Sequence, residues 1–372
     1  MRQTVQGTGT VRRHRSRTSG TAISGISGRT SARITAAALL AAGALCATAL
    51  QAPAAGAAEP PGAAASAPAS ADAKQDAKKA AAFWTAKRMR AAKPLDLLSV
   101  ARKKLDAAAA RAASAPAAHA LPRGKEAAVP PTLPSLPSLP SPGLKAFPQA
   151  GGPWTGGGKV TATAGRVFFT YQNRQASCSG NAVTSDNRST VLTAGHCVKL
   201  DGAWHTNWIF VPGYHDGQAP HGKWAASKTL ATPQWTKSED INYDVGAAVV
   251  PPLNGKHLTD AVGSQGVAFN TGYTQKMYAF GYPAASPYDG SKLIYCSGTT
   301  IKDPLFSKDH GMPCNMTGGS SGGPWFTKFD EKTGTGLQSS VNSFGYTFLP
   351  NTMFGPYFGE DAKNLYNKAQ SS

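Results

Sequence analysis

Two short stretches decide the fold and chemistry of this 372-residue chain: Gly318-Gly319-Ser320-Ser321-Gly322-Gly323-Pro324 and, upstream of it, Thr193-Ala194-Gly195-His196-Cys197. A serine hydroxyl is a poor nucleophile unless a base removes its proton. Flanking glycines permit unusual backbone conformations and let a carbonyl group approach main-chain N–H groups. Asp244 precedes the small apolar run Val245–Val250, so we expect it to be partly buried and to need a partner such as His196.

The chain order of these residues separates them from two other groups of hydrolases. The glycines also fit the G-x-S-x-G pattern around Ser320 or Ser321, but that pattern requires a later histidine, and the last one is His310. An Asp-His-Ser order would need Asp186 as the acid, and the strand-helix context that such enzymes have around the serine is absent. The remaining order predicts His196 as general base, Asp244 as orienting acid and Ser321 as nucleophile, with the N–H groups of Gly319 and Ser321 as oxyanion hole.

Three blocks carry a family resemblance: Thr193–Cys197, Tyr243-Asp244-Val245-Gly246 and Gly319–Pro324. Together they resemble the signature blocks of chymotrypsin-fold serine proteases, nearest to the bacterial branch that includes the glutamyl endopeptidases. The resemblance covers about residues 155–372. It implies an all-β fold of two six-stranded antiparallel β-barrels, hydrolysis of protein or peptide substrates through an acyl-enzyme, and no cofactor. The stretch Glu360–Ala369 lacks Gly and Pro and predicts a closing C-terminal helix.

Departures from the family pattern concern maturation and specificity. Ser320 stands where animal members have the Asp that binds a new N-terminus, so that ion pair cannot form. Asn315 stands where an Asp gives trypsin-like enzymes their preference for Lys and Arg, and Asn342 stands where glutamyl endopeptidases have a His. We therefore expect an uncharged residue before the scissile bond. The residues expected to contact substrate are Asn315, Asn342, Ser343, Phe344 and Gly345.

The five cysteines fit an exported chain. Cys46 lies in an apolar leader and is expected to be lost with it. Four cysteines remain, which allows two disulfides in three possible pairings. Short loops favour Cys178–Cys197 and Cys296–Cys314, each contributing about 3 kcal/mol in the chain-entropy model.

Composition divides the chain into three segments. Residues 1–57 predict a secretory signal peptide, with a basic beginning, the uncharged run Ile34–Leu50 and small residues at Ala55–Ala57. Residues 58–150 are rich in Ala, Lys and Pro and predict a largely disordered pro-region and linker, with basic helices in 72–113 interrupted at Pro94. Residues 151–372 contain all but three of the aromatic residues, Phe83, Trp84 and Phe147, and predict the protease domain.

Charge and ligand patterns exclude other classes of function. Residues 1–150 carry 21 Lys and Arg against 6 Asp and Glu, whereas residues 151–372 carry 17 against 14, so the basic excess lies outside the predicted domain and indicates no nucleic-acid groove. His205, His215, Asp216 and His221 lack metal-ligand spacing and indicate a surface loop, so no metal site is expected.

The sequence thus predicts a secreted, extracellular, monomeric serine endopeptidase without stable membrane association once the signal is removed. Two alternatives remain. One is a catalytically inactive secreted binding protein on a protease scaffold. The other is a basic cell-surface protein that uses residues 72–113. Arg123 and Lys125 are candidate processing points because they are basic and lie in the predicted linker.

Overall fold

The computed structural model describes residues 69–71, 77–96, 98–100, 124–132 and 147–372, all within one unit that extends from Gly62 to Ser372. The predicted signal peptide with Cys46, residues 101–123 and the Leu-Pro-Ser repeats of 133–142 lie outside the described residues. Within the described residues, no helix is long and apolar enough to cross a membrane.

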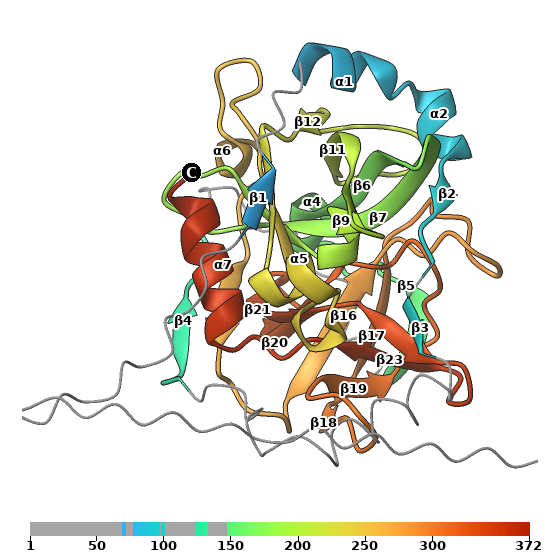
Figure 1. Cartoon of the computed structure of the whole chain (residues 1–372), viewed down its shortest axis with the longest axis vertical. Helices are drawn as coiled ribbons and strands as arrows, with labels where there is room; N and C mark the ends of the chain where they lie inside the picture. Colours follow the sequence, from blue (N-terminus) through green and yellow to red (C-terminus); the bar gives the residue numbers. More distant parts are fainter. Residues whose placement is uncertain (1–68, 72–76, 97, 101–123, 133–146) are drawn as a thin grey trace, which may run out of the picture. The chain divides into compact units, whose positions relative to one another are not determined.

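The first half of the domain is a curled, mainly antiparallel sheet (Figure 1). Its β6–β7 hairpin pairs Tyr171 with Arg174 across a two-residue turn, in which Gln172 and Asn173 both have positive φ, as a type I′ turn requires. In spatial order the domain's own strands are β13 (Lys228–Ala231), β14 (Gly246–Val249), β8 (Thr190–Thr193), β7 (Arg174–Val183), β6 (Ala164–Tyr171), β11 (Thr206–Pro212) and β12 (Trp224–Ala225); β9 (Lys199–Leu200) and β10 (Ala203–Trp204) form a separate hairpin.

The second half of the domain forms two further sheets. The larger contains β15 (Gly266–Phe269), β21 (Thr335–Val341), β20 (Pro324–Asp330), β16 (Lys276–Gly281), β17 (Ile294–Thr299) and β5 (Gln149–Pro153). The smaller contains β18 (Ile301–Lys302), β19 (His310–Pro313), β23 (Thr352–Gly355) and β22 (Phe344–Tyr346). Cys178–Cys197 links strand β7 to the segment after β8, and Cys296–Cys314 links β17 to the segment after β19. These are the pairs that short loops favoured.

Helices are few and short, apart from α7 (Glu360–Gln370) at the C-terminus. Acidic Glu360 and Asp361 begin α7, Lys368 lies in its last turn, and its buried side chains recur three or four residues apart, so its amphipathic face packs on the core. The others in the domain are α4 (Val160–Thr163), α5 (Pro233–Ser238), α6 (Leu258–Val262) and the 3₁₀ turns η1 (Gly195–Cys197) and η2 (Ile241–Tyr243). The predicted all-β, chymotrypsin-like fold with a C-terminal helix is confirmed.

Residues upstream of 151 add a strand to each of the three larger sheets. They form β1 (Ala69–Ala71), α1 (Ala77–Phe83), α2 (Ala86–Ala91), β2 (Lys93–Pro94), β3 (Leu98–Val100) and β4 (Ala127–Val129). Strands β1 and β2 raise the first sheet to nine strands, β4 joins the larger second sheet, and β3 joins the smaller one. Helices α1 and α2 lie within residues 72–113, where basic helices are expected. Trp84 and Ala80 are buried, and apolar contacts offset the entropy of ordering this part of the segment.

Candidate active site

Strand pairing brings His196 and Asp244 to the same end of the first sheet. Strands β8 and β14 are antiparallel, and Thr193, the last residue of β8, lies opposite Gly246, the first residue of β14. The residues that follow β8 and those that precede β14 therefore meet. His196 lies in the 3₁₀ turn after β8, and Asp244 lies two residues before β14.

The carboxylate of Asp244 is buried and accepts three hydrogen bonds. The main-chain N–H of His196 donates to Oδ1 at 2.7 Å, and the ring Nδ1 of His196 donates to Oδ2 at 2.7 Å. The hydroxyl of Ser343 also donates to Oδ2, at 2.6 Å. Because a carboxylate only accepts, Nδ1 of His196 carries the proton, and Nε2 is left with a lone pair.

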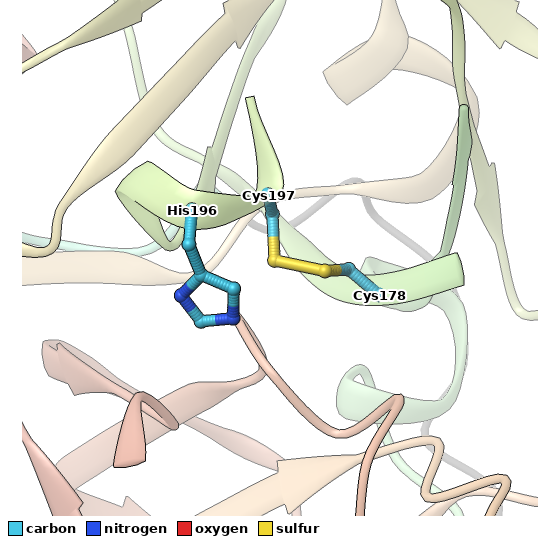
Figure 2. A group of neighbouring side chains, drawn as sticks. All are labelled: Cys178, His196 and Cys197. Atoms are coloured by element: carbon cyan, nitrogen blue, oxygen red, sulfur yellow. A yellow bond between two sulfur atoms is a disulfide. The ribbon is translucent and has the colours of Figure 1, made fainter. Parts of the chain in front are cut away.

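The main chain around His196 is held by several neighbours (Figure 2). The imidazole lies beside the Cys178–Cys197 disulfide, which anchors the next residue. A Cβ on Gly195 would lie 2.6 Å from the ring of Trp235, so only glycine fits there. Nε2 of His205 donates to the carbonyl of His196 at 2.9 Å, and burial lowers the pKa of His205 to about 4, which keeps this ring neutral at pH 7.

The same three side chains also place possible metal ligands close together. One potential ligand atom each from Cys178, His196 and Cys197 lies within 4.8 Å of the others. Both sulfur atoms are bonded to each other, so neither can act as a thiolate ligand. The donor chemistry of this group does not fit a metal site.

The loop that carries Ser321 is shaped by glycines with positive φ. Gly319 has φ of +92° and Gly322 has φ of +77°, and a Cβ on Gly322 would lie 2.1 Å from Oγ1 of Thr193. Ser179, next to Cys178, holds this loop from the first sheet. Its N–H donates to the carbonyl of Ser321 at 2.7 Å, and its hydroxyl donates to the carbonyl of Gly319 at 2.9 Å.

The reactive atoms have no competing partners. Oγ of Ser321 and Nε2 of His196 are both buried, and neither has a hydrogen-bond partner among the described residues. A hydrogen bond between nucleophile and base often forms only when substrate is bound. The arrangement combines an anchored serine with an imidazole whose accepting nitrogen is free.

The side chain of Asn342 is not placed where it could bind substrate. Its side chain is buried, and Nδ2 donates to the carbonyls of Phe280 and Ser320 at 2.8 and 2.9 Å. Its Oδ1 accepts from the indole N–H of Trp325 at 2.6 Å. Both N–H groups of Nδ2 and one lone pair of Oδ1 are therefore used inside the protein, and the prediction that Asn342 contacts substrate does not fit this position. It holds the Ser321 loop against β16 and β20.

The other residues expected to contact substrate lie in different surroundings. Phe344 is buried in an aromatic cluster with Tyr346 and Phe354, Gly345 is half-buried on the same strand, and the hydroxyl of Ser343 is used by Asp244. Asn315 is exposed, and its side chain accepts from the hydroxyl of Tyr288 at 2.6 Å. Ser179 and the acid-binding hydroxyl of Ser343 were not found from the sequence, because nothing local distinguishes them.

A segment from upstream of the domain also reaches this site. The main-chain N–H of Gly319, one of the two expected oxyanion donors, donates to the carbonyl of Leu95 at 2.9 Å. Strand β2, just before Leu95, pairs with β7, and strand β3, just after it, pairs with β22.

Solved structures share this fold at high sequence identity. The protease Anisep from Arthrobacter nicotinovorans is 48% identical, covers 57% of this chain and 96% of its own length, and gives a TM-score of 0.54. The thermostable serine protease AL20 from an extremophilic microorganism is 43% identical, covers 57% of this chain and 99% of its own length, and gives a TM-score of 0.55. This chain belongs to the chymotrypsin-fold serine proteases. As a member of that family it is a serine endopeptidase by fold and relationship.

Two further comparisons add less about this serine protease. No family model matches the chain. The extracellular metalloprotease of Bacillus subtilis strain 168 is 38% identical over 85 residues, which are 22% of this chain and 26% of that protein. The chain thus spans about a quarter of the curated relative it matches.

The predicted loop cluster of histidines does not form a metal site in the described residues. His205 stacks on Phe169, whereas His215 is exposed and His221 is half-buried beside Gly213. The only tight group of potential ligand atoms found in the described part of the chain is the disulfide group above.

Proposed function

We propose that this chain is an exported serine endopeptidase in which Ser321 is the nucleophile, His196 the general base and Asp244 the orienting acid. The observation that carries the proposal is the buried pair between Nδ1 of His196 and Oδ2 of Asp244 at 2.7 Å. A buried carboxylate on one ring nitrogen fixes the tautomer that leaves the other nitrogen able to accept a proton.

The reaction follows from these atoms. Oγ of Ser321 attacks the scissile carbonyl while Nε2 of His196 takes its proton, and the resulting imidazolium is stabilised by Asp244. The N–H groups of Gly319 and Ser321 bind the oxyanion, a type of donor whose loss costs about 10²–10³ in rate. His196 then protonates the leaving amine, and water hydrolyses the acyl-enzyme. The scheme requires no cofactor.

Secretion and maturation belong to the same proposal. Residues 1–57 act as a signal peptide, residues 58–150 as a pro-region, and residues 151–372 as the mature extracellular domain, with two disulfides suited to an oxidising compartment. Ser320 supports maturation without an N-terminal ion pair, because its hydroxyl donates to the carbonyl of Thr317 at 2.7 Å within the loop. The proposed substrates are proteins or peptides with an uncharged residue before the scissile bond.

The rival function is a secreted binding protein on the same scaffold. Such a protein has no need for a free nitrogen on His196 or for a nucleophile loop held by both Ser179 and Asn342. The intact pair of His196 and Asp244 therefore favours an enzyme.

Labelling with a fluorophosphonate probe separates these functions, because only an activated serine reacts at a useful rate. We expect labelling of the processed secreted protein, no labelling of Ser321→Ala, and unchanged labelling of Ser238→Ala, which removes an exposed hydroxyl on α5. A peptide library then determines the preferred residue before the scissile bond. Folded, processed protein that does not react would contradict the proposed function.

A further inference from the structure

We propose that residues 77–96 and 98–100 form a built-in inhibitor that crosses the catalytic site in the direction opposite to a substrate, with the carbonyl of Leu95 on the oxyanion donor Gly319. This inference rests on the proposed function and specifies how that site is kept inactive before maturation. Four features support it: the path of the segment, its direction, its anchor and the atoms that it occupies.

The segment pairs with one strand in each half of the domain, β7 in the first half and β22 in the second. Lys93 and Pro94 of β2 pair with Ala176 and Ser177 of β7, next to the Cys178–Cys197 disulfide, and the N–H of Leu95 donates to the carbonyl of Ser177 at 2.9 Å. On the other side, Leu98–Val100 pairs with Phe344–Tyr346, the strand expected to bind substrate backbone. The segment is thus held as an added strand in each half of the domain.

Leu95 lies between these two pairings along the chain, at the predicted centre of reaction. Its carbonyl accepts from the N–H of Gly319 at 2.9 Å, and the adjacent Asp96 lies against Gly318, where an added Cβ would be 3.0 Å from its Oδ1. A substrate carbonyl needs the same N–H to bind its developing oxyanion. Leu95 and a substrate therefore cannot occupy the site together.

The direction of the segment explains why it would resist cleavage. Both pairings are parallel: the chain runs from β7, past Gly319, to β22. In a productive substrate the leaving nitrogen follows the scissile carbonyl toward His196 and the disulfide beside it, so that Nε2 can protonate it. In this segment the nitrogen of Asp96 instead leads toward β22. Any attack on Leu95 would leave the amine without its proton donor.

The helices α1 and α2 provide an anchor outside the catalytic site. Trp84, between them, is fully buried, its ring lies 5.3 Å from that of Phe168, and its indole N–H donates to the carbonyl of Asn207 at 2.7 Å. Lys223 donates to the carbonyls of Ala81 and Trp84 at 2.6 and 3.1 Å, which satisfies carbonyl groups at the end of α1. The anchor packs on an apolar surface of the domain, called the groove below, that consists of Phe168, Ile209, Val211, Tyr214, Ala225 and Tyr282.

The groove is therefore an interaction surface whose occupant is this chain's own segment. Filling it brings residues 93–96 and 98–100 to the catalytic site at a high effective concentration, so weak strand pairing suffices for inhibition. Cutting the chain within residues 133–146 would make this binding intermolecular, and dilution would then release the site.

The test uses the full secreted chain with a recognition sequence for a specific protease inserted within residues 133–146. The rate at which the fluorophosphonate labels Ser321 is measured before and after cutting, in wild type, in Trp84→Ala and in the control Lys87→Ala, whose side chain is exposed on α2. We expect Ser321 to be labelled about 100-fold more slowly in the intact wild type than in the cut and diluted Trp84→Ala chain. This factor corresponds to the binding energy that a buried Trp side chain contributes. Lys87→Ala should behave as wild type does.

A synthetic peptide of residues 77–100 provides a second arm that does not depend on the variants folding. Added to cut and diluted protein, it should suppress labelling, its Trp84→Ala version should bind about 100-fold more weakly, and mass spectrometry should recover the bond between Leu95 and Asp96 intact. Cleavage of that bond would show an ordinary substrate direction and overturn the proposal. Equal labelling of intact and diluted cut chains would also overturn it and leave a scaffolding role.

Hydrogen exchange distinguishes this failure from failure of the proposed function. If no form of the chain reacts, the endopeptidase proposal fails, but the amide of Gly319 should still be protected in the intact chain and exchange at least 10-fold faster after cutting and dilution. Unchanged exchange at Gly319 would show that Leu95 does not occupy the site in solution, and the inference would then be wrong by itself.

Discussion

Asp244 and Asp309 are both fully buried carboxyl groups, and each has a buried histidine as a close neighbour in space or sequence. Asp244 accepts hydrogen bonds from the main chain and ring of His196 and from Ser343. Neither carboxyl oxygen of Asp309 has a hydrogen-bond partner in the described residues, and the same holds for both ring nitrogens of His310. Both pairs consist of an aspartate and a histidine, but only the carboxyl group of Asp244 has hydrogen-bond donors among the described residues.

The difference shows that burial alone does not make a working acid-base pair. Burial raises the pKa of Asp309 well above its usual range, and the charges of Asp303, Asp244 and Asp240 raise it further, while the main chain of Tyr357 acts in the opposite direction. Burial lowers the pKa of His310 to about 4. Asp309 and His310 are thus stabilised in their neutral forms, whereas the carboxyl group of Asp244 accepts three hydrogen bonds.

Among the substitutions that test this difference between Asp244 and Asp309, we expect Asp244→Asn to have the largest effect, and the effect is on catalysis. An amide facing Nδ1 would favour the tautomer in which Nε2 carries the proton, and Nε2 could then not accept a proton from Ser321. A loss of about 10⁴-fold in kcat is typical of this change. Steady-state kinetics of the processed protein measure it. A loss below about 10-fold would contradict the assignment of Asp244.

Lowering the pH probes the histidine of the second pair. The folded pKa of His310 is about 4 and its unfolded value about 6.5, so its contribution to stability is complete above pH 6.5 and is lost as the pH falls toward 4. The loss amounts to about 3 kcal/mol by pH 4. His310→Gln should lack this part of the acid sensitivity, which urea unfolding at several pH values would show.

Exposed His215 provides the matched control for that measurement. His215→Gln should retain the full wild-type slope of unfolding free energy between pH 6.5 and 4. Burial lowers the pKa of His205 to about 4 as well, so a residual slope from His205 should remain in both variants. Parallel slopes for His310→Gln and wild type would show that His310 is charged or solvated in the folded protein.

A smaller catalytic effect is expected from Ser343→Ala, which removes one of the three hydrogen bonds to Asp244. A hydrogen bond to a charged group is worth about 2 kcal/mol, which corresponds to about 30-fold in kcat. Because the hydroxyl contacts only the acid, we expect KM to change less than kcat. A change in KM alone would indicate that Ser343 acts mainly through substrate binding, as its sequence position first implied.

These residues also show what the sequence could predict. The order of His196, Asp244 and Ser321 follows from short motifs, because the glycines and the cysteine are constrained by contacts close to the chain, such as Gly195 against Trp235. Both disulfides follow from loop length. The fold class follows from the same motifs together with the alternation of short strands and turns.

What the sequence could not predict depends on contacts between distant segments. Ser179 and Asn342 hold the Ser321 loop from other strands, and no local pattern separates them from ordinary serine and asparagine residues. Residues 58–150 are expected to be largely disordered because they are rich in Ala, Lys and Pro and nearly free of aromatic residues. The groove that buries Trp84 is formed by β6, β11 and β12 and their neighbours, so its presence becomes evident only in the folded domain.

The smallest expected effect, that of Asp309→Asn, sharpens the comparison most directly, because the same change is made as at Asp244. A neutral carboxyl group and an amide are similar in size and charge, so we expect kcat/KM to stay within about 2-fold and the free energy of unfolding at low pH to change by less than about 1 kcal/mol. Since the folded pKa of Asp309 is raised, wild-type stability is lost as the pH rises above 3.8, and the variant avoids that loss. The stability of Asp309→Asn relative to wild type should therefore increase with pH. A relative stability that instead fell as the pH rose would mean that Asp309 is ionised and partnered, and that the two buried acids are alike.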